Sequence, residues 1–118
     1  MKKEIIREQV NRQIKEWIRL QNELGGEYSI SPKAIDFVVE VVENIQEDPS
    51  STWQRENFNY EASQERAISL VPEALNDIIA YGRLRSYRRR RDRKITSWEI
   101  WHSLSRTIEK WCFVPKEV

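Results

Sequence analysis

Apolar residues recur every three or four positions along most of this sequence, which is the spacing of one face of an α-helix. The first such segment carries Ile6, Val10, Ile14 and Trp17, and a pair of glycines follows it where a helix end favours residues without a side chain. Only three glycines and four prolines occur in the chain of 118 residues, and 33% of the residues are charged. The pattern predicts an all-α fold of amphipathic helices packed around one core.

Capping residues and prolines divide the chain into about five helices. The first is expected over residues 3–24, and the second begins with Ser31 as its N-cap. A short helix ends near Pro72, which either starts the next helix or kinks a continuous one. A T-x-x-E capping box at Thr96 starts the last helix. Because this length suits one domain, we expect residues 1–118 to form a single compact bundle, with the longest connection over residues 48–60.

Each helix is expected to bury one apolar face. The second helix has a broad stripe, which should make it central in the core. Three of the five tryptophans lie on apolar faces and are expected in the core, whereas Trp53 and Trp98 lie near helix breaks and are open to either role. The residues expected inside include Leu24, Ile35, Phe37, Val38, Val42, Ile45, Ala74, Leu75, Ile78, Ile79, Tyr81, Ile100, Leu104 and Ile108, with Trp17, Trp101 and Trp111.

The formal net charge of +1 averages two unlike parts of the chain. Residues 1–80 contain nine Lys or Arg and fifteen Asp or Glu, a net charge of −6. Residues 81–118 contain eleven Lys or Arg and four Asp or Glu, a net charge of +7. This asymmetry indicates an acidic and a basic surface with different partners, so a nearly neutral chain does not exclude local binding of nucleic acid.

The basic charge is concentrated between the fourth helix and the last one. Four consecutive arginines on a helix would point all round its axis, so this segment should project from the bundle or lie at its rim. Arginine donates paired hydrogen bonds to phosphate, and exposed aromatic rings beside cations stack on the bases of single strands. The sequence therefore predicts a nucleic-acid-binding site formed by Arg83, Arg85, Arg88, Arg89, Arg90, Arg91, Arg93, Lys94 and Trp98, with Tyr81 and Tyr87 beside them.

Two other readings of the basic segment remain open. Cations at the end of a helix stabilise its dipole, and a charged run is often only a solvated face. An acidic protein partner would also complement it. Eight cationic residues exceed what a helix end needs, which favours nucleic acid, with single-stranded DNA preferred and RNA possible.

Acidic residues form a matching stripe on the second helix. Asp36, Glu40, Glu43 and Glu47 recur at helical spacing on the side opposite the core. The stripe is either a solvated face or an interface with a basic surface, such as the arginines of a second copy. Contact between unlike faces of successive copies would build a row.

The sequence gives little support for catalysis or for bound cofactors. His102 is expected to be a partly buried helix histidine, and Cys112 an inert thiol in the core. A single cysteine and a single histidine do not form a zinc site, and no phosphate-binding glycine loop occurs. We therefore expect a protein that is not an enzyme and has no cofactor or metal. A charged N-terminus and the lack of long apolar runs predict a cytoplasmic protein without a membrane segment.

A cysteine-poor helical bundle of about 120 residues with arginines near its C-terminal helices resembles the small subunits of CRISPR interference complexes. Those subunits stack along the effector and contact DNA strands through basic surfaces. The resemblance implies a non-catalytic structural role within a larger antiviral assembly, copies in a row, and backbone contact by Arg85, Arg88 to Arg91, Arg93 and Lys94. A helical regulator that reads duplex DNA and a protein-only adaptor are the alternatives.

Overall fold

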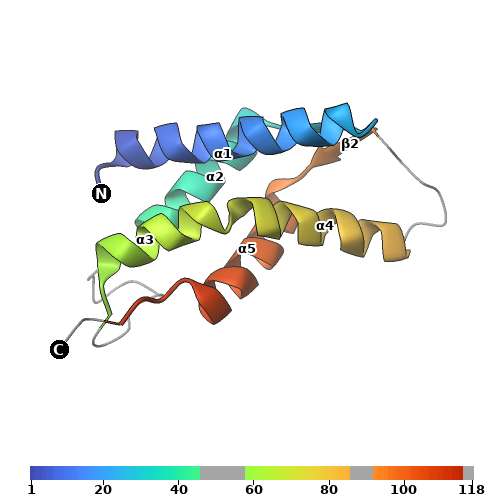
Figure 1. Cartoon of the computed structure of the whole chain (residues 1–118). Helices are drawn as coiled ribbons and strands as arrows, with labels where there is room; N and C mark the ends of the chain where they lie inside the picture. The colour runs from blue at the N-terminus through green and yellow to red at the C-terminus, as the bar shows by residue number, and fades with distance from the viewer. Residues whose placement is uncertain (46–57, 86–91, 116–118) are drawn as a thin grey trace.

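The computed structural model describes residues 1–45, 58–85 and 92–115 of the chain (Figure 1). Along these residues the order of elements is α1 (Lys3–Glu23), β1 (Glu27–Ile30), α2 (Pro32–Glu43), α3 (Tyr60–Ser69), α4 (Val71–Arg85), β2 (Asp92–Ile95) and α5 (Ser97–Trp111). Five helices and one short sheet confirm the prediction of an all-α bundle. The connection expected over residues 48–60 lies almost wholly outside the described residues.

Local signals set the ends of α1 and α2. After α1 the backbone of Gly25 has a φ of 88°, a left-handed conformation that glycine adopts without strain, and the amide of Gly26 returns to the carbonyl of Gln21 at 2.9 Å. A Cβ atom on residue 26 would lie 2.6 Å from the ring of Tyr28, so the glycine also allows this buried ring to pack closely against the turn. Ser31 caps α2 as predicted, because its hydroxyl accepts a hydrogen bond from the amide of Ala34 at 3.2 Å.

The break between α3 and α4 falls at Leu70. Figure 1 shows the two helices following one another almost in line. Leu70 is the C-cap of α3, and Pro72 lies in the first turn of α4, where a missing amide proton costs no hydrogen bond. Pro72 therefore starts a new helix, which was one of the two outcomes that the sequence left open.

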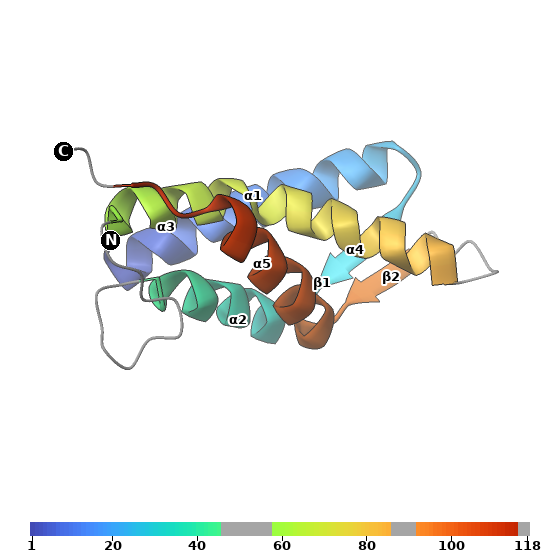
Figure 2. The ribbon, with the colours of Figure 1, turned by 90° about the horizontal axis from the view of Figure 1, so that it is seen from below.

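The sequence did not predict the sheet. β1 and β2 pair in parallel, with Tyr28 beside Arg93 and Ile30 beside Ile95 (Figure 2). Each strand has only four residues, too few for an alternating pattern to be recognised, and the strands pair across more than sixty intervening residues. The order helix, strand, helix therefore occurs twice along the chain, first as α1, β1 and α2 and then as α4, β2 and α5.

The core lies between all five helices and the inner face of the sheet. Trp17 is 3% exposed, and its indole nitrogen donates to the Asn76 side chain at 2.9 Å, which ties α1 to α4. Most of the predicted core residues are buried, and these are Ile6, Val10, Ile14, Ala34, Val38, Val42, Ile45, Ala74, Leu75, Ile78, Ile79, Ile100, Leu104, Ile108 and Cys112. Ile35 and Phe37 are partly buried at the edge of the core. The side chain of Tyr81 lies outside the described part of the structure.

Three core predictions are wrong. Trp101 is 50% exposed and Trp111 is 62% exposed, while Leu24 is 82% exposed. Trp101 follows the buried Ile100, and a step of one residue turns a side chain about 100° around the helix axis, away from the core. Trp111 is the last residue of α5, beyond the buried Ile108. Leu24 lies past the end of α1, where the chain turns outward.

No helix within the described ranges is long and apolar enough to cross a membrane.

Candidate nucleic-acid interface

The junction between β2 and α5 fixes the direction in which the candidate site points. Ile95, the last residue of β2, is fully buried and anchors the strand. Thr96 then forms the predicted capping box, in which its hydroxyl accepts from the amide of Glu99 at 3.3 Å and a carboxylate oxygen of Glu99 accepts from the amide of Thr96 at 3.3 Å. α5 therefore starts at a defined point, one residue after the strand.

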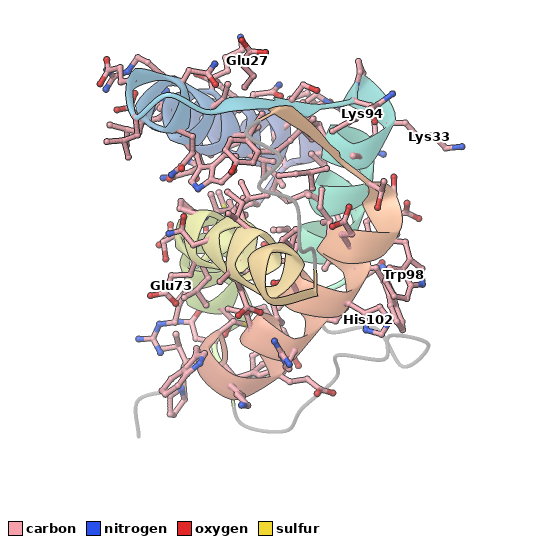
Figure 3. All side chains as sticks on the ribbon, turned by 90° about the vertical axis from the view of Figure 1, so that its right-hand side faces the viewer. Glu27, Lys33, Glu73, Lys94, Trp98 and His102 are labelled. Carbon is pink, nitrogen blue, oxygen red and sulfur yellow. The ribbon has the colours of Figure 1, made fainter. Side chains whose placement is uncertain are left out.

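Lys94 and Trp98 lie on either side of this junction. Lys94 is exposed next to the buried Ile95, and Trp98 is 67% exposed in the first turn of α5. Figure 3 shows both side chains on one side of the molecule, together with Lys33 and His102. Two of the residues predicted to bind nucleic acid are thus exposed on the same side of the molecule.

The other predicted cations lie on the elements that precede this junction. Arg83 and Arg85 lie in the last turn of α4, and Arg93 lies in β2 opposite Tyr28. Arg88 to Arg91 are outside the described residues. We expected the helix to run into the arginines, and α4 includes Arg83 and Arg85, whereas Arg93 and Lys94 lie on a strand that pairs with β1.

Lys33 was missed by sequence reasoning. The two strands are parallel and in register, so their carboxyl ends lie at the same edge of the sheet. α2 begins two residues after Ile30 and α5 begins two residues after Ile95, so both helices start at this edge. Helix starts carry a partial positive charge, which adds to that of Lys33 and Lys94. Lys33 lies at this edge only because β1 pairs with β2, and no local sequence pattern predicts that pairing.

Two further residues on α5 were assigned elsewhere from the sequence. Trp101 was expected in the core, and His102 was expected to be partly buried, but both are exposed. The His102 ring lies 4.3 Å from the Trp98 ring and 5.1 Å from the Trp101 ring, centroid to centroid. The spacing of Trp98 and His102, four residues apart, was the signal that could have found this group.

The acidic stripe on α2 is partly neutralised by α1. Arg7 forms an ion pair with Asp36, and the ammonium of Lys3 lies 3.6 Å from a carboxylate oxygen of Glu43. Glu40 is exposed and has no ion pair within the described residues. Glu47 lies outside them. The stripe therefore offers less unpaired negative charge than the sequence indicated.

α1 also neutralises its own charges. Arg19 lies between two carboxylates, at 2.5 Å from Glu16 and 2.6 Å from Glu23. The hydrogen bond from Arg19 lowers the pKa of the Glu16 carboxyl, and the same bond raises the pKa of the guanidinium. Most cations of the N-terminal helix thus have acidic partners, whereas Lys94 forms no ion pair with any side chain that the structure describes.

A groove lies between α4 and α5. This groove has a volume of about 640 Å³, and the ion pair between Arg106 and Asp77, 2.6 Å long, lies in its wall. Its lining mixes both signs of charge, and consists of Glu73, Asn76, Asp77, Ala80, Arg106, Thr107, Lys110 and Trp111. Because its acids repel phosphate, the groove does not suit a nucleic-acid backbone.

Metal-binding side chains do not gather in the ranges that the structure covers. These ranges contain no group of three or more His, Cys, Asp or Glu side chains that could hold a metal ion. Cys112 is buried in the core, as expected.

Comparison of the chain with protein-family models, with curated proteins and with solved structures found no match.

Proposed function

We propose that this protein is a non-catalytic nucleic-acid-binding subunit that contacts the phosphate backbone of a single strand, with DNA favoured over RNA. The observation that supports this most is the exposure of Lys94 and Trp98, which flank the β2–α5 junction and lie on one side of the molecule (Figure 3). Exposed cations and exposed aromatic rings on one surface are what single-strand-binding proteins use for phosphates and bases.

The arginine-rich segment adds the charge that such a surface needs. Six residues separate the end of α4 at Arg85 from the start of β2 at Asp92, and four of them are arginines. Arg88 to Arg91 precede Lys94 by only three to six residues in the sequence, so we propose that they contact the same strand. Backbone contacts of this kind carry no sequence information, so the proposed binding is indifferent to base sequence.

The proposal includes assembly with further copies or with other subunits. Glu40 of the acidic stripe is exposed and unpaired among the described residues, so it is available to a basic surface of another chain. A place in a CRISPR-type complex would combine both contacts, although the proposed binding stands on the β2–α5 surface alone.

A gel-shift comparison of single-stranded and double-stranded DNA and RNA at two salt concentrations tests the proposal. We expect single strands to bind more tightly than duplexes, and more weakly at the higher salt concentration, because phosphate contacts release counterions. Preference for a duplex of particular sequence would favour the regulator. Indifference to all four ligands would refute nucleic-acid binding and leave the protein adaptor.

A further inference from the structure

Three aromatic side chains form an exposed ridge on the first two turns of α5. Trp98, Trp101 and His102 lie three and four residues apart, which places them on neighbouring positions of the helix surface. The imidazole stands between the two indoles, with interplanar angles of 64° to Trp98 and 83° to Trp101. Because neither contact is a parallel stack and both indoles are at least half exposed, ring surface of both remains accessible.

The ridge is not needed to complete the core. α5 packs inward through Ile100, Leu104 and Ile108, each no more than 2% exposed. The two exposed indoles lie within one turn of the helix and form an apolar surface among charged residues. Exposed apolar surfaces of this kind are typical of interaction sites.

Charge identifies the occupant of the ridge. Lys94 and Lys33 lie on the same side of the molecule as Trp98 and His102 (Figure 3). The arginine-rich segment enters β2 only a few residues before the ridge. A ligand that presents regular negative charges together with flat aromatic faces fits both features. A single-stranded nucleic acid does so, whereas a duplex keeps its base faces stacked inside.

We infer that Trp98 and Trp101 stack on unpaired bases of a single strand while Lys94 and Lys33 contact its phosphates. His102 positions the two indoles by holding their rings apart. This inference rests on the proposed function and extends it, since it adds a base contact by Trp101, which the sequence pattern had placed in the core, to that of Trp98.

The test compares two oligonucleotides with the same number of phosphates. One is oligo(dT) of about 12 nucleotides, and the other has the same backbone with abasic sites throughout. A stacked base contributes roughly 5- to 150-fold in affinity. We therefore expect the wild-type protein to bind oligo(dT) at least about 10-fold more tightly than the abasic strand in fluorescence anisotropy.

Variants locate the effect. W98A/W101A should bind oligo(dT) no more tightly than the abasic strand, and its affinity for the abasic strand should be unchanged. W98F/W101F should recover most of the difference, because phenylalanine also stacks. Trp111→Ala removes an indole that is 62% exposed at the other end of α5 and should change neither affinity.

The outcomes separate this inference from the proposed function. Equal affinity of the wild-type protein for the two oligonucleotides would overturn base stacking and leave phosphate binding in place. Loss of base preference in Trp111→Ala, but not in W98A/W101A, would overturn the location of the site. Failure of both oligonucleotides to bind would overturn the proposed function together with the inference.

Discussion

The two helix–strand–helix units of the molecule share their order of elements but differ in how their charges and tryptophans are used. In the unit α1–β1–α2 the single tryptophan, Trp17, is buried and hydrogen-bonded, and the cations Lys3 and Arg7 are paired with acids on α2. In the unit α4–β2–α5, Lys94 is exposed, and Trp98 and Trp101 face solvent.

This difference shows that one backbone arrangement serves two purposes. The first unit buries its tryptophan and pairs most cations of α1 with acids, although Lys33 and Glu40 on α2 stay exposed. Among the described side chains, the second unit exposes Lys94, Trp98 and Trp101 near the edge where both strands end, while its Arg106 is paired with Asp77. We therefore expect the tryptophan of the first unit to contribute to folding stability, and the exposed tryptophans of the second unit to contribute to the proposed binding.

Truncation of tryptophans in the two units should give the largest contrast. Trp17→Ala creates a cavity in the core and leaves the Asn76 side chain without its donor, so we expect it to lower the free energy of unfolding by about 3–5 kcal/mol. Trp98→Ala should change it by less than about 0.5 kcal/mol. Urea denaturation of both variants measures this, and similar losses would erase the distinction between the two units.

Removal of arginines from the basic segment should have the next largest effect. Changing Arg88, Arg90 and Arg91 to Gln removes three charges at nearly constant size. Each lost phosphate contact lowers the slope of log affinity against log salt by about 0.7, so the slope should flatten by roughly 2 and affinity near 0.1 M salt should fall roughly 100-fold. Thermal stability should barely change, or rise slightly. An unchanged slope would place these arginines away from the strand, and a lost melting transition would place them inside the fold.

Single lysines in the two units provide a matched pair. Lys94→Gln should flatten the salt slope by about 0.7, which corresponds to roughly 5-fold weaker binding near 0.1 M salt. Lys3→Gln removes the same charge from a lysine that is paired with Glu43, and it should leave the slope unchanged. Equal effects of the two substitutions would mean that only the overall charge of the protein matters.

The smallest effect is expected from the acidic stripe. Glu40→Lys should weaken association between copies or with a basic partner, but by no more than about 1 kcal/mol, because exposed charge pairs contribute little. Asp36→Asn provides the comparison, since Asp36 is already engaged by Arg7. Sedimentation at several protein concentrations measures both, and unchanged association of Glu40→Lys would remove the stripe from the interface.

Local rules were enough to predict most of the fold from the sequence. The glycine turn after α1, the Ser31 cap and the Thr96 capping box act within a few residues, and each is found as predicted. Burial also followed from periodicity in the middle of helices. Periodicity gave the wrong burial for Trp101, at the edge of the apolar face of α5, and for Trp111, at the end of the helix. Periodicity identifies the apolar face of a helix, but it does not show how far along the helix, or how far around it, other elements cover that face.

The candidate site could be predicted only in part. Lys94 and Trp98 were found because they are neighbours in sequence. Lys33 was not found, because its position on the same side of the molecule depends on the pairing of β1 with β2. Each strand has only four residues, and the two strands together contain only three large apolar residues, Tyr28, Ile30 and Ile95, so the sequence carries no recognisable strand pattern. The partners of Asp36 and Glu43 were missed for the same reason, since they come from another helix.

The indole N–H signals of the tryptophans in a ¹H–¹⁵N NMR spectrum test the central claim most directly. Titration with oligo(dT) should shift the signals of Trp98 and Trp101, and leave those of the buried Trp17 and of Trp111 at the far end of α5 in place. Assignment by single Trp→Phe variants identifies each signal. If Trp98 and Trp101 stay unmoved at saturating ligand, or Trp111 shifts in their place, the β2–α5 surface is not where this protein binds a single strand.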